Sequence, residues 1–568
     1  MANVENIEQQ YSSDILIIGG GIAGLVAAIK MKEYDSTLDV LIVDKATTGL
    51  SGSKANKGAG VLQVIPENKD VDEFIEYNLK NIGHYLNDQD LMRKYAYTSR
   101  EVVKDLERWG IPCMREEDGS LSGLEALPHW CLTAIDLDFM FKLHKIANQL
   151  GIKMVNKTQT VEVLTNDNRA VGCVGFNIIS GEYAVFKAKA TVLATGSCNW
   201  DVAHMWRSGR GDGIAAAYRA GAELRNAEYA NFHNVFLPAG MSVQVGSQYS
   251  LYNKKGERLS DKYCKENECD FDIGIFLGME KEVMEGNGPI VWEESEFFNN
   301  NPLAAGGLLF KWNRPWADNF HWREMGKEEK YSSDNRWKPI AEPLFIGELS
   351  AVKTDHNMKT TIEGLWAIGD TSRGGAGMSG AVAGPPARMR GSGLMWAAVS
   401  SLLCYEDVAK TAKVSAEAEI DAVQVAKFKE EIYAPMKCEK GLDVRDNIHN
   451  LKETVAPPRF SLRKNADRID EALDMIHEIQ NRLPTISPQN DYHLLGQWHD
   501  LKNMALCGEL VFTAAMDRTE SRGWHVREDY PERDDKNWLK WIVLKNDNGK
   551  IAISYDDIPM DQYKFKPE

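Results

Sequence analysis

Cysteine is scarce in this chain, and long apolar runs are absent. The 568 residues include nine cysteines, with no C-x-x-C spacing. This excludes a disulfide scaffold and fits a reducing compartment, so we expect a cytoplasmic protein. No window approaches 18 uninterrupted apolar residues, and the polar, acidic first residues do not have the pattern of a signal peptide. We therefore expect no membrane span.

Positive charge is also in deficit. The 66 Lys and Arg residues against 83 Asp and Glu residues give a formal net charge of −17. Nonspecific nucleic-acid binding requires a surplus of cations to neutralise phosphates, so we expect no nucleic-acid partner. The balance still leaves room for a local cationic pocket that binds a small anion.

The stretch from residue 13 to residue 44 has the pattern of a dinucleotide site. Three glycines, spaced G-x-G-x-x-G, separate a short apolar strand from a predicted helix. The first glycine permits a tight turn, the second lets a pyrophosphate approach the backbone, and the third allows close helix–strand packing. An acid that ends the next apolar strand is placed to bind a ribose 2′-hydroxyl. These elements are the strand at 14–18, Gly19, Gly21, Gly24, the helix at 25–34 and Asp44.

The residues after Asp44 favour FAD over NAD. Small side chains dominate positions 45–60, which suits a large cofactor that lies close to the backbone. No second glycine fingerprint opens a helix, so we expect no separate nicotinamide-binding domain. We interpret the glycine-rich run at 374–380 as a close backbone approach to the flavin ring.

Motifs along nearly the whole chain resemble those of the flavoprotein subunits of the fumarate reductase, succinate dehydrogenase and L-aspartate oxidase family. Within it, the sequence is most similar to the α subunit of dissimilatory adenylylsulfate reductase. The C-terminal run Arg518-Thr-Glu-Ser-Arg522-Gly-Trp-His525-Val-Arg527-Glu-Asp529-Tyr-Pro531 is long and specific. The other motifs are the glycine fingerprint and the segments 186–196, 208–213, 228–233, 354–370 and 388–394.

The resemblance implies an α/β fold, with a Rossmann-like FAD-binding domain, an inserted α+β capping domain and a C-terminal helical domain. The expected boundaries are 1–230 and 345–410 for the FAD-binding domain, 231–344 for the cap and 411–568 for the C-terminal domain. Amphipathic spacing predicts helices over 416–431, 465–483 and 493–518. Alternating residues over 538–555 predict a strand pair that turns at Asn548-Gly549.

The resemblance also implies which residues hold FAD. Gly52 stands where many membrane-linked members have a histidine that bonds covalently to the flavin, and glycine has no nucleophile. We therefore expect noncovalent FAD. The expected cofactor contacts are Gly19, Gly21, Ile22, Ala23, Gly24, Asp44, Lys45, Ser51, Gly52, Ser53, Gly58, Ala194, Thr195, Gly196, Asp212, Gly369, Asp370, Ser392, Gly393 and Leu394.

The substrate side matches the family only in part. His233 matches a substrate-side histidine, and we expect it to donate a hydrogen bond to an anionic substrate. Arg388 matches the arginine that grips a carboxylate, and Arg390 is a second candidate. Ile346 stands where a second histidine is expected, and no arginine occurs between Arg258 and Arg314, where the family has its proton donor. Another acid, Glu348 or Asp272, would have to supply the proton.

These departures leave the reaction open. The leading hypothesis is a catalytic flavoprotein that transfers hydride between flavin N5 and a small anionic or unsaturated substrate, with electrons exchanged through a ferredoxin-like iron–sulfur subunit. The scattered cysteines support a separate electron carrier, because a cluster needs grouped thiolates and only Cys264 and Cys269 lie close together. The alternatives are an adenylylsulfate-reductase-like subunit acting on a sulfur or nucleotide substrate, a catalytically decayed electron-transfer flavoprotein, and an oxygen-using flavin oxidase.

Overall fold

The computed structural model describes most of the chain. It covers residues 8–50, 52, 61–121, 129–136, 138–202, 209–237, 241–243, 250–264, 273–293, 340–372, 380–381 and 391–568, with the backbone alone at 232, 234–237 and 241–243. No helix within these ranges is both long enough and apolar enough to cross a membrane.

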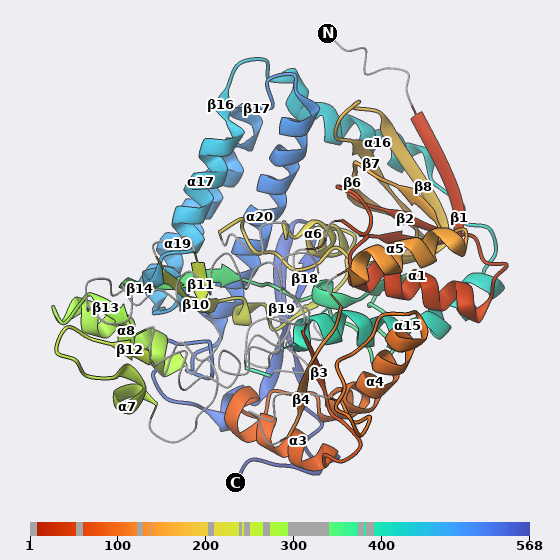
Figure 1. Cartoon of the computed structure of the whole chain (residues 1–568). Helices are drawn as coiled ribbons and strands as arrows, with labels where there is room; N and C mark the ends of the chain where they lie inside the picture. The colour runs from red at the N-terminus through yellow and green to blue at the C-terminus, as the bar shows by residue number, and fades with distance from the viewer. Residues whose placement is uncertain are drawn as a thin grey trace, which may run out of the picture.

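A seven-stranded sheet dominates the described N-terminal half and carries the glycine fingerprint at one edge (Figure 1). Its strands run in the order β5-β2-β1-β8-β7-β6, and β15 also pairs with β8. β5, β2, β1, β8 and β15 are parallel, whereas β8, β7 and β6 form an antiparallel meander. The strands are β1 (Glu8–Ile18), β2 (Val40–Val43), β5 (Lys153–Val155), β6 (Thr158–Asn166), β7 (Arg169–Asn177), β8 (Tyr183–Leu193) and β15 (Leu365–Ala367).

Helix α1 (Ile22–Tyr34) connects β1 to β2 and is apolar around most of its circumference. Such a helix must be covered on both sides. The parallel strands lie on one side, and α15 (Ser392–Val414) packs along the other. Three further helices complete this layer: α3 (Val71–Asn78), α4 (Gln89–Arg108) and α5 (Phe139–Gln149). The core therefore holds the fingerprint loop rigidly at the carboxyl edge of the sheet.

A second sheet carries His233. Its order is β11-β10-β14-β13-β12, and α8 (Ile273–Met284) packs against it at the left of Figure 1. In the pairing of β10 with β14, Phe232 lies opposite Gly347 and His233 opposite Phe345. Its strands are β10 (Phe232–Leu237), β11 (Met241–Val243), β12 (Leu251–Tyr252), β13 (Ile290–Trp292) and β14 (Ile340–Gly347).

The C-terminal region is helical and ends in a hairpin. α17 (Val444–Val455), α19 (Ala466–Arg482) and α20 (Tyr492–Asp517) pack on one another, with α18 (Pro458–Ser461) at their base. The hairpin is formed by β18 (Lys540–Asp547) and β19 (Lys550–Asp557), and β18 also pairs with β9 (Leu224–Arg225). The two later helices and the hairpin match the sequence prediction.

The helix predicted over 416–431 begins six residues late. α16 spans Ala422–Tyr433, and the Asp421 carboxylate caps it by accepting a hydrogen bond from Val423 N over 2.8 Å. An aspartate in this position ends the preceding extended segment and starts the helix. The predicted α/β fold with a helical C-terminal region is thus confirmed. The predicted domain boundaries stay a prediction.

Candidate functional site

Glycine is required at two positions where β1 passes into α1. Gly19 has a φ of +110°, and a Cβ there would lie 2.3 Å from the carbonyl oxygen of Ala194. At Gly24 a Cβ would lie 2.0 Å from the carbonyl oxygen of Gly19. Gly21 precedes α1 without a side-chain cap, so the first-turn N–H groups of the helix keep their positive potential for a phosphate.

Asp44 follows β2 and faces this loop. One carboxylate oxygen accepts a hydrogen bond from Gly20 N over 2.6 Å, and the other accepts one from Ala46 N over 2.6 Å. These two bonds fix the carboxylate against the turn at the end of the parallel strands. The acid expected for a ribose hydroxyl therefore lies directly beside the glycine loop.

One cavity brings most of the predicted cofactor residues together. Fourteen of the twenty line it: Gly19, Gly21, Ile22, Ala23, Asp44, Lys45, Gly52, Ala194, Thr195, Gly196, Asp212, Gly369, Asp370 and Gly393. Gly24, Ser392 and Leu394 lie in the helices behind the lining, within α1 and the first turn of α15. Ser51, Ser53 and Gly58 lie outside the described residues.

Other residues of the cavity wall were missed by sequence reasoning. Thr158, Gln159 and Thr160 line it from the start of β6. Gly20, Ala46, Gly209 and Ala397 complete the set, together with Ile18 and Val43 at the strand ends. The β6 residues carry no motif. They enter the cavity because β6 starts immediately after β5, which is paired with β2 beside Asp44.

A network of charges lies along the cavity wall. Lys45 Nζ donates to Asp212 over 2.7 Å and to Asp500 over 2.9 Å. Gln159 Nε2 also donates to Asp500, over 2.9 Å. Burial raises the pKa of the Asp500 carboxyl. Burial also opposes ionisation of Asp212, but the Lys45 ammonium holds the pKa of Asp212 below its ordinary value. Helix α20 is thereby joined to the cavity wall.

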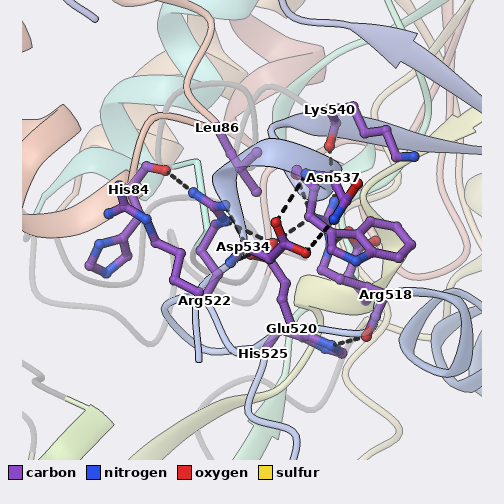
Figure 2. Close-up of polar contacts among 12 residues, drawn as sticks. His84, Leu86, Arg518, Glu520, Arg522, His525, Asp534, Asn537 and Lys540 are labelled. Atoms are coloured by element: carbon purple, nitrogen blue, oxygen red, sulfur yellow. Dashed lines mark hydrogen bonds and ion pairs between the residues drawn. The ribbon is translucent and has the colours of Figure 1, made fainter. Parts of the chain in front are cut away.

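The C-terminal signature forms a second buried network (Figure 2). Arg518 and Arg522 both donate to the Glu520 carboxylate, over 2.9 and 2.8 Å, and Arg518 also donates to Glu228 over 2.8 Å. Arg522 reaches the carbonyl oxygen of His84 over 2.7 Å. The signature therefore ties the end of α20 to the segment before β10 and to the turn that precedes α4.

Two family models match this chain. A model described as "FAD binding domain" matches residues 14–292, and one described as "Fumarate reductase flavoprotein C-term" matches residues 450–568. This chain belongs to the fumarate reductase and succinate dehydrogenase flavoprotein family. Its cofactor is FAD, and it is an FAD-dependent oxidoreductase.

Relatives of this flavoprotein match it from end to end. The fumarate reductase flavoprotein subunit of Haemophilus influenzae is 26% identical, over 97% of this chain and 95% of that protein. A quinol fumarate reductase structure from E. coli superposes with a TM-score of 0.81 at 21% identity, covering 99% of this chain and 98% of the other. Adenylylsulfate reductase from Archaeoglobus fulgidus gives a TM-score of 0.76 at 18% identity, with the same coverage. These two structures show the shared fold.

The described residues of the flavoprotein fit FAD. The glycine loop offers backbone N–H groups at a helix N-terminus, which suits a pyrophosphate. Gly52 lies against this loop with a φ of +100°, and a Cβ there would lie 3.2 Å from Gly21 Cα. A left-handed backbone in such close contact suits glycine and disfavours a residue with a large side chain.

His233 is fully buried in the flavoprotein. Its ring lies parallel to Trp524 at a centroid distance of 6.5 Å and packs against Phe345 at 5.6 Å. Nε2 lies 3.0 Å from the hydroxyl of Ser461. Burial, with the nearby Lys464 ammonium, lowers the pKa of His233 to about 3, so the ring is neutral at physiological pH.

The remaining predicted catalytic residues divide into two groups. Glu348 follows β14 with a φ of +73° and is buried; it comes directly after Gly347, which pairs with Phe232. Non-glycine residues rarely adopt this conformation, and such strain is concentrated at functional sites. Arg388, Arg390 and Asp272 lie outside the described residues.

Proposed function

We propose that this flavoprotein is the catalytic subunit of a reductase or dehydrogenase acting on a small anionic or unsaturated substrate. The carrying observation is the cavity, where fourteen of the predicted cofactor residues converge at the carboxyl edge of the parallel sheet. Bound FAD supplies hydride transfer at its N5 atom. The chain's own contribution is to bind the cofactor, position the substrate and deliver a proton.

The lining residues suggest how FAD is held. The N–H groups after Gly19 would hold the pyrophosphate, and Asp44 would hold the adenosine ribose. Thr195 and Gly196 would contact the adenosine side, whereas Gly369 and Asp370 would contact the ribityl chain. Gly52 carries no nucleophile, so FAD is bound noncovalently.

A flavin assay tests this proposal. The purified protein is expected to show the flavin absorbance bands, and acid precipitation is expected to release all of the flavin into the supernatant. Yellow colour that stays with the precipitate would refute noncovalent binding. Protein that neither carries flavin nor takes up added FAD would refute the function itself.

Substrate positioning is assigned to His233 and Arg388, with Arg390 and Glu348 as further candidates. The pairing of β10 with β14 is compatible with this assignment, because Glu348 directly follows Gly347, which pairs with Phe232, the residue before His233. The test is anaerobic reoxidation of the photoreduced flavin by a panel that includes fumarate and adenylylsulfate. We expect at least one compound to reoxidise the flavin, and we expect His233→Ala and Arg388→Ala each to abolish this turnover. Absence of reoxidation by every compound favours a decayed electron-transfer protein.

Electrons are proposed to pass to or from a separate ferredoxin-like iron–sulfur protein. Within the described ranges no three His, Cys, Asp or Glu side chains group as a metal site. Reconstitution with a reduced two-cluster ferredoxin should reduce the flavin under anaerobic conditions. Rapid peroxide formation in air without any partner would instead identify a flavin oxidase.

A further inference from the structure

The hydroxyl of Ser461 lies where it can select one tautomer of His233. The Ser461 Oγ lies 2.9 Å from the carbonyl oxygen of Ala456 and 3.0 Å from that of Pro457, as well as 3.0 Å from His233 Nε2. A hydroxyl has one proton and two lone pairs. Two carbonyl oxygens cannot donate, so the hydroxyl keeps a carbonyl acceptor only if its proton points toward them and a lone pair points toward the ring. In that arrangement His233 carries its proton on Nε2 and donates it to Ser461.

This assignment determines what the other ring nitrogen can do. Nδ1 is unprotonated, because a neutral imidazole carries a single proton. It is buried and has no hydrogen-bond partner among the described residues. A buried acceptor without a partner costs roughly 1–3 kcal/mol, so it calls for an explanation. A second proton on the ring is disfavoured, since His233 is enclosed by Phe276, Phe345 and Trp524 and lies near the Lys464 cation.

Ser461 itself is held firmly. Its carbonyl oxygen accepts hydrogen bonds from Lys464 Nζ and Asn231 Nδ2, both over 2.9 Å. Its amide nitrogen bonds to the carbonyl oxygen of Pro457 at 3.0 Å. All three side chains, those of Ser461, Lys464 and Asn231, are buried. The hydroxyl therefore cannot turn toward His233 without leaving its carbonyl acceptors.

We propose that His233 acts as a hydrogen-bond acceptor through Nδ1, toward a ligand group that carries an O–H or N–H, and that Ser461 is the positioning residue that holds this tautomer. The inference rests on the proposed function, which places His233 at the substrate. It reverses the direction expected from the sequence, where His233 was to donate to an anion.

The substrate class follows from this direction. An ionised carboxylate offers no proton to Nδ1, and its charge would meet a lone pair. A carboxamide, a hydroxyl or a protonated acid at this position forms a hydrogen bond instead. Ile346 agrees with this reading, since it puts an apolar, buried side chain where the family's second substrate histidine is expected. The substrate therefore presents a hydrogen-bond donor, such as a carboxamide or a hydroxyl, to His233.

Two compounds of the same shape test the ligand class. Fumarate is a dianion without a donor, whereas fumaramate replaces one carboxylate by a carboxamide. In a titration followed by the flavin difference spectrum, we expect the holoenzyme to bind fumaramate about tenfold tighter than fumarate. Equal or tighter binding of fumarate, or no spectral response to either compound, overturns the proposal. Protein without flavin gives no signal at all and indicates instead that the proposed function has failed.

Two replacements of His233 test which nitrogen acts. His233→Asn places an amide oxygen near the Nδ1 position, so it should keep the preference for fumaramate. His233→Gln reaches the Nε2 position and leaves nothing at Nδ1, so it should lose the preference. If His233→Gln keeps the preference for fumaramate and His233→Asn loses it, Nδ1 is not the acceptor.

The tautomer can be read without any ligand. In ¹⁵N-histidine-labelled holoenzyme, the ring signal that His233→Asn removes should show a protonated Nε2 and an unprotonated Nδ1. Ser461→Ala should change this signal, and Ser461→Thr, which keeps the hydroxyl, should restore it. Ser99→Ala is the matched control, because Ser99 is equally buried and donates to the Ala96 carbonyl in α4. A protonated Nδ1, or a signal that Ser461→Ala leaves unchanged, refutes the proposal.

Discussion

Arg518 and Glu228 form a fully buried ion pair, in which Arg518 Nε donates to Glu228 over 2.8 Å. The two residues are far apart in the sequence: Glu228 precedes β10, and Arg518 follows α20. Glu520 shares the same guanidinium at 2.9 Å. The pair therefore connects the strand that carries His233 to the C-terminal signature.

Removing this guanidinium should be strongly destabilising. Arg518→Met leaves Glu228 and part of Glu520 buried without a counter-charge, a change that typically costs about 3–5 kcal/mol. Thermal unfolding of the holoenzyme measures the loss. Glu76→Gln is the control, because it breaks an exposed i,i+4 pair with Lys80 and should leave the melting temperature nearly unchanged. Similar melting of the two variants would show that the buried pair contributes little.

The glycine loop makes a second prediction, on cofactor content. Gly19→Ala places a Cβ 2.3 Å from the Ala194 carbonyl oxygen at a φ of +110°, so the loop must move away from the cavity. We expect most bound flavin to be lost, measured as the flavin-to-protein absorbance ratio. Gly110→Ala is the control: it also has a positive φ, +74°, but no atom within 4 Å of the added carbon. Flavin retention in Gly19→Ala equal to that in the control would contradict the assigned role of the loop.

Sequence patterns predicted those elements of the fold that are determined by short-range interactions along the chain. The strand, glycine loop and helix at the N-terminus, α19, α20 and the terminal hairpin all follow from periodicity and turn chemistry. The start of α16 was misplaced because the apolar spacing extends before Asp421, whose carboxylate ends the extended segment.

The site was predictable only where a motif marks it. Gln159 and Asp500 were missed because they meet Lys45 and Asp212 through tertiary packing of β6 and α20, which no short spacing reveals. The roles predicted for His233 stay a prediction. The hydrogen-bond direction that we propose for His233 depends on Ser461, which is 228 positions away in the chain.

The glycine of the C-terminal signature should be irreplaceable for a similar steric reason. Gly523 has a φ of +57°, and a Cβ there would lie 2.1 Å from the carbonyl oxygen of Ala381, which accepts the Trp524 N–H over 3.0 Å. Gly523→Ala should melt well below Gly549→Ala. Gly549 has a φ of +87° and no atom within 4 Å of the added carbon. Its replacement by alanine therefore costs only the strain of a left-handed backbone, about 1–2 kcal/mol. Equal melting temperatures would mean that the contact with Ala381 is dispensable.

Lys464 predicts a pH dependence of stability. Its ammonium is buried, donates to the Ser461 carbonyl oxygen over 2.9 Å, and has no carboxylate partner in the described part of the chain. Burial, reinforced by the Arg527 cation, lowers the pKa of Lys464 to about 7. In the unfolded chain the pKa of a lysine is near 10.4. Below pH 7 Lys464 is protonated in both the folded and the unfolded protein, so the folded protein bears the full free-energy cost of burying the ammonium.

Between about pH 7 and pH 10 the unfolded state holds more protons than the folded state, so the free energy of unfolding rises with pH. The gain from this single group is on the order of 4 kcal/mol, reached as pH approaches the unfolded pKa. Lys464→Met removes this titrating group. At pH 6.5 we therefore expect the variant to melt at a higher temperature than the wild type. At pH 9.5 the two melting temperatures should be equal, or the wild type should melt higher. Lys255→Met, at an exposed lysine, should follow the wild-type curve throughout. Parallel pH curves for wild type and Lys464→Met would show that Lys464 keeps an ordinary pKa in the folded protein.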